Sequence, residues 1–200
     1  LSTREIVLLA TAPGVVVHEL AHEFACVMSG ITVRDVTYFQ LDSPVGFVEH
    51  GAPKNWIQAA AISLAPLGFN VLFAATALLS AFIFISGDSS AVIVALTLCW
   101  LAFSSLVHSF PSIIDTQNLW SFTYDKFWRW PLLPLVGVIY GVVKLIYSVG
   151  YLSVTLVFAS ITTPAILVLM GVSPEPGIVC LLNGQWGCWG VPPVQVLLGL

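Results

Sequence analysis

The chain has 200 residues, of which 58% are hydrophobic and only 8% are charged. A soluble globular domain carries about 25% charged residues, so this composition and its long uncharged runs indicate a membrane protein. The net charge of −4 comes from 10 acidic and 6 basic side chains, spread thinly along the chain. This distribution excludes nucleic-acid binding, which depends on clustered Lys and Arg.

Residues 5–28 form the first apolar segment, and they are long enough to cross a bilayer core, which needs roughly 20 residues. Gly30 follows as the predicted helix end. Residues 31–50 mix β-branched and aromatic side chains with polar ones, and a turn-forming stretch at 42–44 divides them. We therefore expect an extended β-hairpin at the membrane surface after the first helix.

Two further apolar stretches follow the hairpin. Residues 57–86 are the longer, and Pro66 and Gly68 interrupt the helix that they predict. Residues 91–110 predict a third span. The more polar, tryptophan-rich stretch 111–130 is typical of a membrane–water interface.

Residues 131–171 are apolar over about two spans, with Gly150 as the predicted hinge. Residues 172–200 are rich in Gly, Pro and Trp and predict a re-entrant or surface segment. We therefore expect an all-α polytopic membrane protein with about five transmembrane helices and one short β-hairpin. Residues 1–130 would form a three-helix core that includes the hairpin, and residues 131–200 would add further helices and a C-terminal segment.

The distribution of basic residues predicts the orientation of the chain. If the helices alternate across the membrane, the connections 29–56 and 111–130 lie on the same side. That side carries most of the loop charges, Arg34, Lys54, Lys126 and Arg129, against Arg4 on the other. We therefore expect a multi-pass integral membrane protein whose 29–56 side faces the cytoplasm.

Two histidines and a glutamate stand inside the first apolar segment, where an unpaired ionisable group costs about 2.5 kcal/mol or more. His18 and His22 are four residues apart, so on a helix both imidazoles can reach one metal ion. Glu19 lies about 100° around the helix, where it can take a proton from water beside that ion. The alternative is that these are ordinary core histidines. In that case nothing would offset the free-energy cost of placing them in an apolar span. The His-Glu-x-x-His pattern is typical of zinc hydrolases.

A catalytic zinc takes three protein ligands and water, so a third ligand must come from elsewhere in the chain. Asp115 is the leading candidate, because it follows the third span on the same side of the membrane as His22. Its alternative role is to cap a helix that begins at Thr116. His108 is the second candidate ligand, although a hydrogen bond within the site or a place at the interface is favoured for it.

Other polar residues in apolar surroundings have two interpretations each. Asn70, deep in the second segment, could donate to an oxyanion or could form an interhelical hydrogen bond, and the residues alone leave both open. Glu23 is expected to support the site or to lie at the interface rather than to bind the ion. A bridge between Cys180 and Cys188 is also left open.

Together these positions resemble the site-2 protease family of intramembrane zinc metalloproteases. That family carries its His-Glu-x-x-His motif on the first core helix, a small-Gly-Pro-x-x-Asn stretch on the second and an Asp ligand on the third. His18, Glu19 and His22 match the first motif in full. Residues 65–70, Ala-Pro-Leu-Gly-Phe-Asn, match the second loosely. Asp115 lies in Pro-Ser-x-x-Asp where the family commonly has Asp-Gly, as in a divergent branch.

The resemblance covers about residues 5–120, and it implies an enzyme that hydrolyses peptide bonds of membrane-embedded or membrane-proximal proteins. One zinc ion per chain would bind His18, His22 and Asp115, with Glu19 as general base. Asn70 would hold the oxyanion or the substrate backbone. The active site would lie nearer the cytoplasmic side of the bilayer.

The same resemblance implies how substrate and water reach the site. An extended substrate would add to the edge of the 31–50 hairpin, and a polar channel would admit water from the cytoplasmic side. A homo-oligomer or a regulatory membrane partner is left open. The rival interpretation is an inactive zinc-binding membrane protein that serves as a partner-binding subunit or a metal carrier. Glu19 argues against it, because a structural zinc needs no base.

Overall fold

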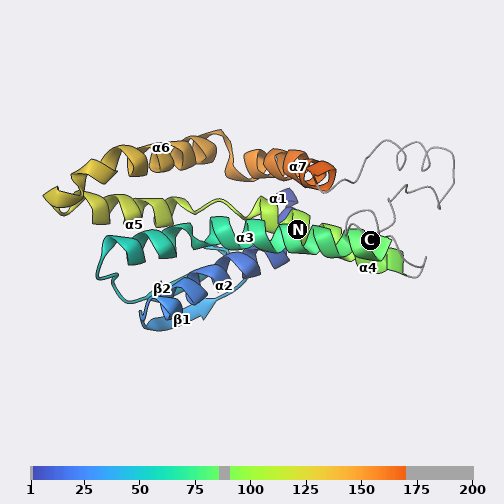
Figure 1. Ribbon diagram of the computed structural model, residues 1–200, viewed down its shortest axis with the longest axis horizontal. Helices are drawn as coiled ribbons and strands as arrows, with labels where there is room; N and C mark the ends of the chain where they lie inside the picture. The colour runs from blue at the N-terminus through green and yellow to red at the C-terminus, as the bar shows by residue number, and fades with distance from the viewer. Residues whose placement is uncertain (1, 86–90, 170–200) are drawn as a thin grey trace, which may run out of the picture.

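The computed structural model describes residues 2–85 and 91–169 (Figure 1). The predictions for residues 172–200, a Cys180–Cys188 bridge among them, lie outside these ranges. The elements follow in the order α1 (Thr3–Ala10), α2 (Ala12–Met28), β1 (Val33–Thr37), β2 (Phe47–His50), α3 (Trp56–Ile85), α4 (Val92–Val107), α5 (Ile113–Tyr124), the 3₁₀ helix η2 (Phe127–Leu132), α6 (Leu133–Val149) and α7 (Tyr151–Leu169).

Two helices of the described ranges, Trp56–Phe84 and Arg129–Val149, are long and apolar enough to cross a membrane. The pair α1 and α2 adds a third candidate if its two helices, bent by 64°, count as one broken span. Two shorter apolar helices, Val92–Val107 in α4 and Tyr151–Ala165 in α7, do not reach the length of a full span. The structure therefore supports a mostly helical membrane protein, whereas the predicted number of about five spans is not confirmed.

The first apolar segment is broken, not straight as expected for 5–28. α1 ends at Ala10 and α2 begins at Ala12, with Pro13 in the first turn of α2. Proline has no N–H to continue a preceding helix, and this is the physical reason for the break. The hydroxyl of Ser104 on α4 satisfies both sides of the break: it donates to the Thr11 carbonyl at 2.9 Å and accepts the Gly14 N–H at 2.7 Å.

The predicted helix end and β-hairpin are confirmed. Gly30 adopts a left-handed φ of 67°, and the N–H of Ile31 donates to the Cys26 carbonyl at 2.9 Å, so a Schellman motif ends α2. β1 and β2 then pair antiparallel. The hairpin is tied to α2 by the Tyr38 hydroxyl, which donates to the Glu23 carboxylate at 2.6 Å.

α3 continues through Pro66 and Gly68, so the predicted interruption of this helix is wrong. Apolar helices tolerate proline where neighbouring groups satisfy the freed backbone. α4 and α5 pack end to end along α3: Leu106 of α4 clusters with Leu78, and Leu119 of α5 clusters with Ala59. The break between α4 and α5 therefore lies beside the middle of α3 (Figure 1).

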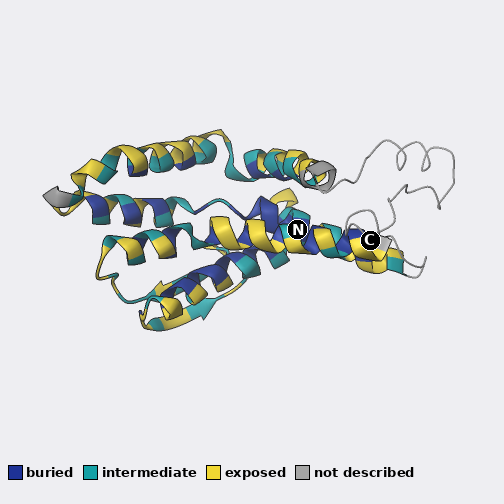
Figure 2. Ribbon diagram, viewed as in Figure 1, coloured by how far each residue is buried: buried dark blue, intermediate teal, exposed yellow. Residues whose placement is uncertain are grey.

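α6 and α7 cover the other side of α4 and α5, and they are separated at Gly150, where the sequence predicts a hinge (Figure 1). Gly150 has a positive φ of 118°, which a residue with a side chain rarely adopts. Figure 2 shows exposed positions along α6. They include a stripe of large apolar side chains at helical spacing, Leu135, Val138, Val142, Leu145 and Val149. A helix with such an outer face fits a lipid environment.

Candidate metal centre

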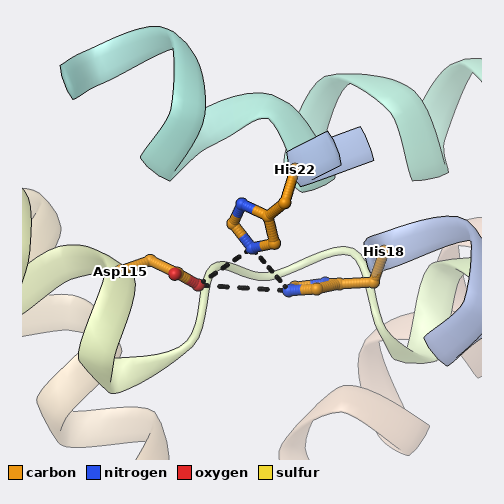
Figure 3. Close-up of side chains that lie close together, drawn as sticks. All are labelled: His18, His22 and Asp115. Carbon is orange, nitrogen blue, oxygen red and sulfur yellow. Dashed lines mark hydrogen bonds and ion pairs between the residues drawn. The ribbon is translucent and has the colours of Figure 1, made fainter. Parts of the chain in front are cut away.

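Three of the residues predicted to bind a metal converge between α2 and the start of α5. Their ligand atoms lie within 4.8 Å of one another, and the side chains point toward a common centre (Figure 3). The Nε2 atoms of His18 and His22 are 3.3 Å apart. The Asp115 Oδ2 is 3.3 Å from the His22 Nε2 and 4.0 Å from the His18 Nε2. Both histidines are buried.

These separations fit a tetrahedral ion. Zinc binds histidine nitrogen and carboxylate oxygen at about 2.0–2.2 Å, so two ligand atoms of a tetrahedral site lie about 3.3–3.5 Å apart. Two of the three edges have this length, and the 4.0 Å edge between His18 and Asp115 needs only a small side-chain movement. Two imidazoles, one carboxylate and a fourth open position are the ligand set of catalytic zinc sites.

Each imidazole is fixed by a hydrogen bond at its other nitrogen. The Nδ1 of His18 lies 2.7 Å from the carbonyl oxygen of His108, at the end of α4. The Nδ1 of His22 lies 2.9 Å from the carbonyl oxygen of Ile62, on α3. Because a carbonyl only accepts, each Nδ1 donates a proton to its carbonyl, and Nε2 is left as the nitrogen that can bind a metal.

Asp115 is held by the N-terminus of its own helix. Ser112 is the N-cap of α5, its hydroxyl accepts the Asp115 N–H at 3.1 Å, and its own N–H donates to Asp115 Oδ2 at 2.8 Å. This is a capping box with aspartate at its third helical position. The helix therefore begins at Ile113, not at Thr116, and capping and ligation involve the same carboxylate.

The charge state of Asp115 follows from these neighbours. In the metal-free protein burial raises the pKa of the carboxyl, but the charge and hydrogen bond of protonated His22, the charge of His18 and the hydrogen bond of the Ser112 side chain outweigh burial and hold the pKa at about 2. The carboxylate is thus ionised at neutral pH, as a metal ligand must be.

Glu19 is buried beneath the hairpin. A Cβ added at Gly46, which directly precedes β2, would lie 2.7 Å from the Cγ and 2.8 Å from the Oε1 of Glu19. Glycine is thus required for the hairpin backbone to approach this carboxylate so closely. Within the described part of the chain, no basic side-chain nitrogen lies within 4.0 Å of the Glu19 carboxylate.

Glu23 lies one turn further along α2 and contacts the hairpin, not the three-residue group. Its bond with Tyr38 raises the pKa of the tyrosine, because the phenol must stay protonated to donate. This supports the expectation that Glu23 does not bind the ion but lies at the edge of the site.

His108 and Asn70 lie in the hydrogen-bond network behind the site. The His108 side chain is buried, with Nε2 2.9 Å from the Thr11 hydroxyl, so it links α4 to the break before α2. The Asn70 amide donates to the Pro66 carbonyl at 3.0 Å and accepts from the Ser105 hydroxyl at 2.6 Å. The contact favours the interhelical interpretation of Asn70, and its predicted oxyanion role stays a prediction.

A pocket of about 520 Å³ leads to Asp115 between α5, the start of α3 and the hairpin. Its polar wall residues include Arg34, His50, Asn118 and Ser121. Ile62 also lines it, one residue before the wall residue Ser63. The pocket offers water and polar groups a route to the Asp115 side of the centre.

Sequence reasoning missed several groups that shape the centre. The Ser-x-x-Asp spacing of Ser112 and Asp115 is a recognisable capping-box pattern and could have identified Ser112. The carbonyls of Ile62 and His108 carry no sequence signal, because every residue has a carbonyl. The approach of Gly46 to Glu19 likewise depends on how the hairpin packs.

No protein-family model matches the chain, and neither curated proteins nor solved structures show significant similarity to it.

Proposed function

We propose that this protein is an intramembrane zinc metalloprotease of the site-2 protease type. The observation that supports the proposal is the convergence of His18, His22 and Asp115, with Glu19 on the same turn of α2. A zinc ion held by the three would polarise the scissile carbonyl and lower the pKa of a water molecule at the open position. α2 belongs to a candidate broken span, and the helices around it are apolar, which fits a site within the bilayer.

Glu19 and the two histidines have separate roles in this mechanism. Glu19 accepts the proton of the attacking water and returns it to the leaving amine, and its burial under the hairpin keeps it close to the reacting atoms. The Nδ1–H groups of His18 and His22 stay bonded to backbone carbonyls, so the rings keep their orientation throughout.

The substrate class follows from the surroundings of the site. Among the described residues β1 and β2 pair only with each other, so each has one edge without a strand partner there, and an extended peptide can pair with such an edge. A membrane-embedded helix must unwind before its amides can pair in this way. We therefore propose membrane-embedded or membrane-proximal proteins as substrates, cleaved nearer the cytoplasmic side.

A comparison of Glu19→Gln with wild type tests the proposal. The chain is purified in detergent, its zinc content is measured by mass spectrometry, and cleavage of labelled casein and of a labelled single-span peptide is followed. Wild type is expected to hold one zinc ion per chain and to cleave. Glu19→Gln should keep the zinc and lose about 10²–10⁴-fold in rate, the contribution of a general base.

Glu5→Gln is the matched control, because it makes the same change on α1, which holds none of the three ligands. It should cleave like wild type. Wild-type material without zinc would contradict the metal site. Zinc-bound wild type and Glu19→Gln that cleave equally fast would contradict the assigned base, and zinc binding without any cleavage would favour the partner-binding or carrier role.

A further inference from the structure

α3 carries a proline one helical turn beyond the carbonyl that binds His22. Pro66 lies inside α3, and its side chain is fully buried. In an uninterrupted helix, the N–H of residue 66 would donate to the carbonyl of Ile62. Proline has no N–H, and its ring crowds that carbonyl, so the Ile62 oxygen loses its ordinary helical partner.

The freed carbonyl is the one that His22 uses. Its oxygen lies 2.9 Å from the Nδ1 of His22, and the interaction is buried. The proton on Nδ1 leaves the lone pair on Nε2, which faces Asp115 Oδ2 at 3.3 Å. The Ile62 carbonyl thus links the missing N–H of Pro66 to the orientation of the His22 ring.

The imidazole of His18 also bonds to a carbonyl without its usual helical partner, but for a different reason. The carbonyl of His108 lies at the end of α4, and in a continuing helix the N–H of Ser112 would bind it. The Ser112 N–H donates instead to Asp115. The His108 carbonyl is therefore open to the Nδ1 of His18, at 2.7 Å. A helix end frees one carbonyl and a proline frees the other.

We propose that Pro66 is a positioning residue of the metal centre. By withholding an N–H it reserves the Ile62 carbonyl for His22, and it thereby determines which nitrogen of that ring faces the ion. The inference rests on the metal site of the proposed function but not on proteolysis. Apolar helices tolerate proline without any such role. The proposal therefore gives Pro66 a function beyond being tolerated.

Two substitutions distinguish the effect of the missing N–H on zinc binding from the effect of the buried volume of the proline ring. Pro66→Ala and Pro66→Val both restore the N–H, and valine keeps most of the buried volume. In both, the N–H of residue 66 competes with His22 for the Ile62 carbonyl. Zinc affinity, measured by chelator competition on the full chain in detergent, is expected to fall about tenfold or more, as for other partners of ligating histidines.

Stability should move the opposite way, because a helix interior tolerates other residues better than proline. The unfolding midpoint of the metal-free variants is expected to equal or exceed that of wild type. Cobalt(II) bound in place of zinc reports the ligand geometry, and its visible absorption bands should shift in both variants. Pro164→Ala is the control, since it makes the same change inside α7, which holds none of the three ligands.

The proposal is supported only if both Pro66 variants bind zinc more weakly at undiminished stability while Pro164→Ala binds like wild type. Unchanged zinc affinity overturns it. Weaker binding in Pro66→Ala alone assigns the effect to lost packing, and weaker binding with a lower midpoint assigns it to general destabilisation; both overturn it. Wild type that binds no zinc overturns the metal site itself, a separate and distinguishable result.

Discussion

Each imidazole of the candidate centre is held at both ring nitrogens, with Nδ1 on a backbone carbonyl and Nε2 toward the common centre. This division explains how two histidines can be buried in an apolar segment. The backbone satisfies one nitrogen of each ring, and an ion with Asp115 would satisfy the other. Glu19 differs from them, since within the described residues its carboxylate has no ion pair within 4.0 Å.

The contact between Gly46 and Glu19 gives a prediction at the scale of single residues. In Gly46→Ala the new Cβ would lie 2.7 Å from the Glu19 Cγ, so the carboxylate must shift. A displacement of about 1 Å in an active site can cost on the order of 10²-fold in rate. Casein cleavage by Gly46→Ala should fall by about that factor, while the zinc content stays at the wild-type level.

Gly51→Ala serves as the control on the same hairpin. Its Cβ would have its nearest neighbour at 3.7 Å, an ordinary contact, so activity should be unchanged. If Gly46→Ala were as active as wild type, the hairpin would not position Glu19.

Helix ends and breaks supply most of the groups that orient the ligands. The capping box of α5 places Asp115 in the first turn, where the helix dipole also favours a carboxylate. The Schellman motif at Gly30 ends α2 and turns the chain into the hairpin that covers Glu19. Local hydrogen bonds at an element end thus determine where the Asp115 carboxylate points.

The capping box predicts the effect of Ser112→Ala at this scale. Loss of the cap should destabilise the fold by about 1 kcal/mol. Because the same box orients Asp115, zinc affinity should also fall about tenfold, as for other partners of metal ligands. Thermal unfolding and chelator competition measure the two effects.

Ser2→Ala is the matched variant, since Ser2 and Glu5 form a second capping box, on α1. It should lower helix stability without a change in zinc affinity. Equal zinc affinity in Ser112→Ala and wild type would show that the cap does not position the ligand.

The molecule as a whole is organised around two helix breaks: the α4–α5 break lies along α3, and the α1–α2 break packs against the end of α4. α2 approaches α4 closely through Gly14, where a Cβ would overlap the Ser104 carbonyl. His108 and Ser104 on the α4 side bind Thr11 at the break before α2. This packing brings α2 and α5, far apart in sequence, to one ion site.

Two glycines test this organisation. Gly14→Ala should destabilise the whole fold by about 1–3 kcal/mol, because the overlap is with backbone and cannot relax locally. Gly68→Ala, where no atom lies within 4 Å of the new Cβ, should be neutral or stabilise by up to about 1 kcal/mol. Thermal unfolding in detergent compares them, and equal midpoints would contradict the close α2–α4 contact.

The apolar composition, the i, i+4 spacing of His18 and His22, the glycine at the end of α2 and the turn signal of the hairpin are local properties, and the sequence by itself determined them. The periods of helix and strand set which side chains share a face, so such patterns can be read without a fold. Motif resemblance and predicted topology predict Asp115 as a ligand, and its convergence with the histidines needed coordinates.

Tertiary structure decided the rest. The uninterrupted α3, the end-to-end packing of α4 and α5, and the carbonyls that hold the two rings depend on contacts between distant segments. Every residue has a backbone carbonyl, and the sequence does not show which carbonyl or which glycine lies beside the site. Packing alone selects the few that face a histidine or a buried carboxylate.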